Sequence, residues 1–156
     1  MADSALSPPE RRFLQELNAL GVRYLVVGVG AAVLQGATTA TQDIDLWFER
    51  LDDSRIREAV DAAGGVWISG GVGLRAPAIG GDALGDRFDV VVHMHGLGSF
   101  AFEYGASKEI ALDGVPVRVL PLDRIIQSKR ALGRARDLAQ IPALEEALAA
   151  LNEKPG

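Results

Sequence analysis

The segment from Tyr24 to Glu49 constrains the fold more than any other part of the sequence. It reads YLVVGVGAAVLQGATTATQDIDLWFE: an apolar run that ends at a glycine, a short alanine-rich stretch, and a second run with an Asp-x-Asp pair. Residues two apart in a strand project from the same face, ~6.6 Å apart along the chain. We therefore predict a strand, a short helix and a second strand, over 23–28, 31–35 and 42–49.

The alternation in the second run places two carboxylates on one face of the predicted strand. Ile44 and Leu46 point into a core, as does the aromatic ring two residues on, so Asp43 and Asp45 share the opposite face. Carboxylates held this close repel each other unless a cation lies between them, and a divalent metal ion is the obvious candidate. Taken alone, an Asp-x-Asp pair more often reflects a strand start and a turn.

A third carboxylate, Asp89, lies on another predicted strand over 87–93. If the two strands are neighbours, its oxygens converge with those of Asp43 and Asp45. Such a cluster suits one or two Mg²⁺ ions, or Mn²⁺ in their place, because these ions prefer carboxylates, water and substrate phosphates. His93 and His95 form a His-x-His that could ligate a metal, but no third nitrogen or sulfur ligand is evident, so a structural role is the better interpretation.

Two further positions favour an anionic ligand. Gly28 closes a buried strand just before a helix, where backbone N–H groups and the helix dipole attract phosphate, although a simple turn explains it as well. Lys129 shares a helix face with Ile125 and Ile126, so it either extends along the edge of the core or reaches an anion. It lies in the one basic neighbourhood of an acidic chain, with Arg124, Arg130, Arg134 and Arg136.

Composition indicates a folded α/β protein. The chain has 156 residues, a net charge of −5, 48% hydrophobic residues and no cysteine, which predicts one domain over 1–156, a cytoplasmic setting and no membrane partner. The acidic balance argues against broad nucleic-acid binding.

The remaining predicted elements are helices after Ser7 and after Asp53, a short strand over 66–69, a hairpin of 109–112 and 115–120, and helices over 122–132, 134–139 and 142–151.

Taken together, these features resemble the DNA polymerase beta-type nucleotidyltransferase superfamily, in particular small bacterial members such as minimal nucleotidyltransferases and abortive-infection-type toxins. Those chains read glycine-glycine, an alanine, a histidine-glycine, and then Arg-x-Thr-x-Asp-Ile-Asp. The residues in register here are Gly28, Ala31, Gly36, Thr41, Asp43, Ile44 and Asp45. Residues 120–129 and the Arg136-Asp137 pair resemble a later part of the family pattern. The likeness therefore spans roughly residues 22–151.

The resemblance implies a mixed β-sheet flanked by helices, with C-terminal helices, and Mg²⁺-dependent transfer of a nucleoside monophosphate from a nucleoside triphosphate to an acceptor. The acceptor would be a tRNA end, a protein hydroxyl or a small molecule, and an antitoxin is an expected partner if the chain is a toxin. The implied metal ligands are Asp43, Asp45 and Asp89, the last also deprotonating the acceptor. The implied nucleotide contacts are Gly28, Val29, Thr41 and Lys129, with Asp137 in support.

Two alternatives stay open. Val29, Gln35 and Thr39 replace a small residue, a histidine and an arginine of the family pattern, so one alternative is a nucleotidyltransferase-like protein that binds a nucleotide or a partner without turnover. The other is a dinucleotide-binding module, because Gly28-Val29-Gly30 begins a G-x-G-x-x-G pattern with an acidic residue at a suitable distance. Val33, however, occupies the third glycine position.

Overall fold

A computed structural model describes residues 6–38, 43–70 and 76–153. Thr39 and Thr41 therefore lie outside the described residues. The helices are α1 (Pro8–Ala19), α2 (Gly28–Leu34), α3 (Ser54–Ala62), α4 (Phe100–Gly105), α5 (Leu122–Leu132) and α6 (Ala135–Glu153). The strands are β1 (Tyr24–Val27), β2 (Ile44–Phe48), β3 (Val66–Ile68), β4 (Ala78–Gly80), β5 (Phe88–Val91), β6 (Lys108–Leu112) and β7 (Val115–Val119).

The fold is built on a five-stranded mixed sheet with the order β5-β2-β1-β7-β6. β1 lies at its centre and is buried along its whole length, as expected for a continuous apolar run covered on both faces. It is antiparallel to β2 and parallel to β7, while β2 is parallel to β5. This sheet confirms the predicted fold class. It excludes the dinucleotide-binding alternative, which requires parallel strands on either side of the first helix.

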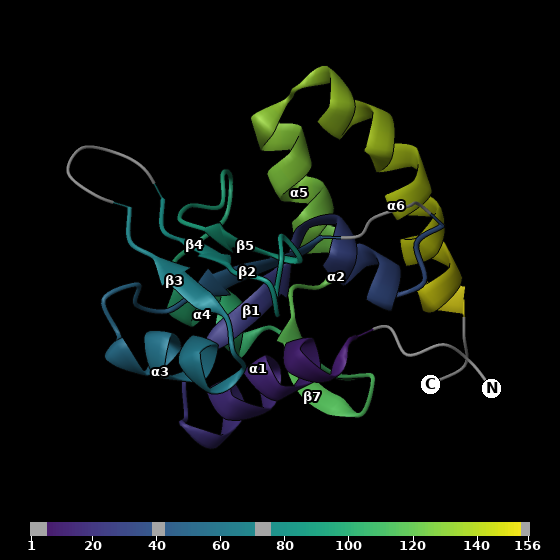
Figure 1. Cartoon of the computed structure of the whole chain (residues 1–156). Helices are drawn as coiled ribbons and strands as arrows, with labels where there is room; N and C mark the ends of the chain where they lie inside the picture. Colours follow the sequence, from purple (N-terminus) through teal and green to yellow (C-terminus); the bar gives the residue numbers. More distant parts are fainter. Residues whose placement is uncertain (1–5, 39–42, 71–75, 154–156) are drawn as a thin grey trace.

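Helices cover the sheet in two groups (Figure 1). α1 and α3 pack side by side below the sheet in that view, while α5 and α6 pack against each other at the top and along the right-hand side. α1 begins as predicted: Ser7 and Glu10 form a reciprocal capping box, with proline in the first turn. Its buried stripe consists of Phe13, Leu14 and Leu17. No helix within the described ranges is long and apolar enough to span a bilayer.

The structure departs from the predicted elements at several places. The two predicted C-terminal helices are one, α6, which runs through Pro142. Proline removes only one backbone donor, and Ile141 and Leu144 continue the same buried face on either side of it. β5 ends at Val91, so His93 lies beyond the strand rather than on it. β4 and α4 were not predicted; β4 pairs with β3 in a separate two-stranded sheet.

α4 is anchored to α5 by a buried ion pair. The Glu103 side chain has no exposed surface and accepts hydrogen bonds from Arg124 Nε at 2.9 Å and Nη2 at 2.6 Å. It also accepts one from the Gly98 backbone at 2.8 Å. The Arg124 hydrogen bonds hold the pKa of Glu103 below its ordinary value. Phe100, also in α4, packs edge-on against Trp47 of β2, with 5.3 Å between the ring centroids.

We expect Glu103→Gln to destabilise the protein by ~2 kcal/mol, because the variant loses charge-assisted bonds and leaves the Arg124 charge without its buried partner. Folding lowers the pKa of Glu103, so the ion pair stabilises the protein at neutral pH. This stabilisation is lost as the pH falls below the pKa of an ordinary glutamate. Denaturant unfolding at pH 7 and pH 3.5 measures both effects. Glu146→Gln, on the exposed side of α6, is the control and should change stability little.

Candidate active site

The strand register brings Asp45 and Asp89 together. In the antiparallel pair of β1 and β2, Asp45 lies opposite Val27, the last residue of β1. In the parallel pair of β2 and β5, Asp45 lies opposite Asp89. Neighbouring strands are ~4.8 Å apart, so two carboxylates in register on one face are within reach of each other. Their side chains interact, and this interaction is one of the causes that raise the pKa of Asp45.

Gly28 packs directly against the Asp45 carboxylate. It is the first residue of α2 and has a φ of +70°, in the left-handed region that favours glycine. A Cβ atom at this position would lie well inside van der Waals contact with Asp45 Oδ2. The absence of a side chain therefore leaves room for the carboxylate, which is a reason for glycine here that does not depend on phosphate. Val29 follows in the first turn of α2 and is half-buried.

Asp43 lies just before β2 rather than within it, and its residue is exposed. It lines a neighbouring cavity of about 560 Å³ together with Glu10, Asp82 and Asp86. Its charge still reaches the strand carboxylates, because it raises the pKa of both Asp45 and Asp89. The structure thus brings two of the three predicted carboxylates into contact and places Asp43 beside them.

The proton affinity of the pair reflects its surroundings. Burial, the charges of Asp89 and Asp43, and the hydrogen bond to Asp89 raise the pKa of Asp45 to about 6, while Lys129 opposes the shift. Burial, followed by the charge of Asp43, also raises the pKa of Asp89. Carboxylates that are short of positive charge bind either protons or a cation, so the raised values mark the place where a cation is most favourable.

Lys129 and Asp45 line the same cavity, of about 270 Å³. Its side chain is 12% exposed, and its Nζ lies 3.4 Å from Oδ1 of Asp137, whose own side chain is 1% exposed. Arg134 donates to both oxygens of Asp137. These bonds, those of Arg134 first, keep the pKa of Asp137 below its ordinary value. Asp137 therefore contacts the Lys129 ammonium beside the cavity.

Other side chains complete the wall of this cavity. Gly28 and Asp45 lie at the strand end, and His93 and His95, in the loop after β5, contribute two rings whose centroids are 4.7 Å apart. Arg134 also lines it. The sequence placed Arg134 only in a basic neighbourhood; its spacing of three residues from Asp137, at the start of a helix, was the signal that could have assigned it.

The basic neighbourhood is largely neutralised by the protein itself. Arg124 is committed to Glu103, and Arg130 pairs with Glu145 at 2.9 Å. The positive charge that reaches the cavity is therefore that of Lys129 and Arg134, both partly balanced by Asp137. A continuous basic surface suited to a nucleic-acid backbone does not follow from this arrangement.

The carboxylate oxygens at this site fit a magnesium ion whose remaining coordination positions are filled by substrate. Among the residues that the structure describes, no three His, Cys, Asp or Glu side chains gather closely enough to hold a metal by themselves. Mg²⁺, however, is commonly bound by one or two carboxylates, with water and substrate phosphates filling the other positions. The neighbouring oxygens of Asp45 and Asp89 have this chemistry.

No protein-family model matches the sequence, and no curated protein sequence is significantly similar to it. Solved structures are similar in fold. The crystal structure of ANT(2'')-Ia in complex with adenylyl-2''-tobramycin has a TM-score of 0.59 and 16% identity, over 90% of this chain and 88% of that one. The solution structure of the antibiotic-resistance factor ANT(2'')-Ia has a TM-score of 0.59 and 18% identity, over 92% and 82%.

A third similar structure is an antigenic nucleotidyltransferase-like protein from Paracoccidioides brasiliensis, with a TM-score of 0.54 and 18% identity, over 94% of this chain and 88% of that one. The protein therefore has a nucleotidyltransferase fold. This likeness spans nearly the whole chain and agrees with the superfamily resemblance of the sequence motifs at the level of the fold.

Proposed function

We propose that the protein is a nucleotidyltransferase that moves a nucleoside monophosphate from a nucleoside triphosphate to an acceptor hydroxyl. The observation that carries this proposal is the pairing of Asp45 with Asp89 on adjacent strands, with Gly28 against one carboxylate and Lys129 across the same cavity. The nucleotidyltransferase fold of the similar solved structures supports it.

In this mechanism, the residues of the chain position the substrates and balance their charge. Asp45 and Asp89, with Asp43 beside them, would hold Mg²⁺, which neutralises triphosphate charge when bound. Lys129 offsets the remaining charge on the phosphates, and the Gly28 turn allows close approach. The Asp89 carboxylate accepts the proton of the acceptor hydroxyl. The acceptor oxygen then bonds to the α-phosphorus, the bond to the bridging oxygen breaks, and pyrophosphate leaves.

Among the three acceptor classes, we favour a small molecule that carries amines as well as hydroxyls. The cavity next to Asp43 is lined by Asp82 and Asp86, and a cationic acceptor would be attracted to these carboxylates. A tRNA end fits less well, because the net charge is −5 and Lys129, Arg130 and Arg134 are each paired with a carboxylate of the protein. The ANT(2'')-Ia complex holds an adenylylated tobramycin, an acceptor of the favoured kind.

The test is incubation with each α-labelled nucleoside triphosphate, Mg²⁺ and three acceptor sets: aminoglycosides and polyamine alcohols, bulk tRNA, and a protein lysate. Transfer to the first set supports the favoured acceptor. Transfer to tRNA or protein would instead support a toxin-like member with an antitoxin partner. Nucleotide binding without transfer to any set would favour the alternative without turnover. The absence of both binding and transfer would refute the proposal.

We expect Lys129→Gln to lower kcat/KM by ~100-fold, because it removes a preorganised charge from a largely buried position. Steady-state transfer kinetics measure the loss. Lys108→Gln is the matched control, since Lys108 is exposed on β6 and should leave kcat/KM within about twofold. Unchanged kinetics for the Lys129 variant would remove this residue from the mechanism.

A further inference from the structure

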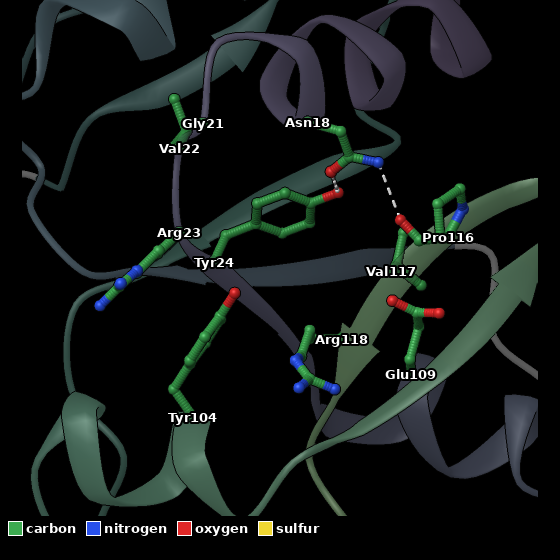
Figure 2. A pocket seen from close by; sticks show the side chains of 10 residues that line it. All are labelled: Asn18, Gly21, Val22, Arg23, Tyr24, Tyr104, Glu109, Pro116, Val117 and Arg118. Atoms are coloured by element: carbon green, nitrogen blue, oxygen red, sulfur yellow. Dashed lines mark hydrogen bonds between the residues drawn. The ribbon is translucent and has the colours of Figure 1, made fainter.

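A third cavity, of about 490 Å³, lies at the opposite end of β1 from the carboxylate pair, and Figure 2 shows the residues that line it. β1 and β7 share a single registered pair, Val26 with Val119, so the two strands separate toward their first residues and leave this space. Tyr24, at the start of β1, lines the cavity, whereas Val27, at its end, lies beside Asp45. The two sites are thus ~10 Å apart along the strand. The volume is in the range of small-molecule sites.

The wall formed by α1 and β1 is held in place by hydrogen bonds. The Tyr24 hydroxyl donates to Asn18 Oδ1 at 2.9 Å, and Asn18 Nδ2 donates to the Pro116 carbonyl at 2.8 Å. Asn18 therefore joins the end of α1 to both strands that border the cavity. Because its hydroxyl is already bonded, the largely buried Tyr24 side chain (4% exposed) borders the cavity with ring carbons (Figure 2).

The opposite wall carries two charges that do not neutralise each other. Glu109 and Arg118 are directly opposite in the antiparallel pair of β6 and β7, so their side chains project from the same face. Such a pair would ordinarily form an ion pair. Within the described part of the chain, however, neither residue forms an ion pair within 4.0 Å, and both line the cavity (Figure 2).

The Arg118 guanidinium contacts the Tyr104 ring. The Arg118 Cζ atom lies 5.5 Å from the centre of the Tyr104 ring, and Arg23 Cζ lies 5.7 Å from the same ring. Figure 2 shows the two guanidinium groups on either side of Tyr104, with Arg118 on the side of Glu109. Arg23 is balanced by Glu49 at 3.6 Å. Arg118 is thus a preorganised cation that faces the cavity.

We propose that this cavity binds a small zwitterion, an α-amino acid with an apolar side chain. The planar fork of Arg118 matches a carboxylate, Glu109 matches the adjacent ammonium, and the Tyr24 ring accommodates the side chain. The neighbouring strand positions suit the short separation of the two charges in an α-amino acid. This inference does not depend on the nucleotidyl-transfer proposal, because the cavity shares no residue with the carboxylate pair or Lys129.

The test is calorimetric titration of the full chain with L-phenylalanine in the absence of Mg²⁺ and nucleotide. Three matched probes separate the charges: N-acetyl-L-phenylalanine lacks the cation, L-phenylalaninamide lacks the carboxylate, and inorganic phosphate is an anion alone. Saturable binding of the amino acid, weakened at least ~10-fold by either blocked probe, supports the proposal. Phosphate binding in preference to the amino acid would overturn it, as would no binding of any probe at millimolar concentration.

Variants locate the binding. Arg118→Gln and Glu109→Gln should each weaken the binding of L-phenylalanine by ~10-fold or more. Arg57→Gln, an exposed arginine on α3, is the charge-matched control and should leave the affinity unchanged. Asp45→Asn should also leave it unchanged, so a failure of nucleotidyl transfer and a failure of this site can be told apart. If neither cavity substitution changes the affinity for L-phenylalanine, and thermal melts show that both variants are folded, the assignment is refuted.

Discussion

Replacing Asp45 with asparagine is expected to lower nucleotidyl transfer by on the order of 10³-fold, since the variant loses the central carboxylate of the site. The same substitution should make the metal-free protein more stable. Burial and the charges of Asp89 and Asp43 raise the pKa of Asp45 from 3.8 to about 6, so its ionised form is unfavourable in the fold. The asparagine amide can donate to the Asp89 carboxylate without adding charge.

The size of this stabilisation follows from the pKa. A shift of that extent corresponds to at most ~3 kcal/mol, and the partial exposure of the side chain reduces the expected gain to ~1.5 kcal/mol, or ~3 °C in Tm. Thermal and denaturant unfolding in the presence of a chelator measure it. Asp61→Asn, an exposed carboxylate on α3, is the control for the change in net charge and should alter neither stability nor activity by a comparable amount.

The gain should depend on pH in a defined direction. Because the folded-state pKa of Asp45 is higher than its unfolded value, the wild-type protein loses stability as the pH rises from about 4 to about 6. The advantage of Asp45→Asn should therefore be absent near pH 4 and complete above about pH 7. An advantage that grows toward acid pH, or a variant that is less stable at pH 7, would contradict the account of uncompensated charge.

Substituting Gly28 with alanine is expected to lower transfer by ~100-fold, because the new Cβ atom must displace the Asp45 carboxylate that it would overlap. The positive φ adds a backbone cost of ~1–2 kcal/mol for any residue with a side chain. Gly114→Ala separates the two effects: Gly114 has a φ of +85° with nothing within 4 Å of the added atom. The Gly114→Ala variant should lose stability but keep full activity.

A double-mutant cycle isolates the contact between the two positions. In an Asp45→Ala background the carboxylate oxygens are gone, so Gly28→Ala should cost ~1 kcal/mol less in unfolding free energy than it does in the wild type. Equal costs in the two backgrounds would show that the backbone conformation alone explains the glycine. Full activity of the single Gly28→Ala variant would show that the position of the Asp45 carboxylate tolerates displacement.

Much of the fold could be predicted because it is encoded in local patterns. The helix start after Ser7, the hairpin that turns between 112 and 115 and the strand that carries Asp45 all depend on residues a few positions apart, and each appears in the structure at the predicted place. The errors arose where non-local packing decides. α6, which continues through Pro142, packs along α5, and α4 is tied to α5 by the Glu103–Arg124 ion pair.

The sequence by itself therefore determined which strand carries Asp45, that a glycine follows the first strand of the site, and that Lys129 lies on an otherwise apolar helix face. Only the tertiary structure decided that Asp89 contacts Asp45, that Asp43 lies beside the pair, and that Arg118 and Glu109 face a cavity unpaired. The physical reason is that periodicity is a property of neighbouring residues, whereas strand order and register depend on which distant segments bury their apolar faces together.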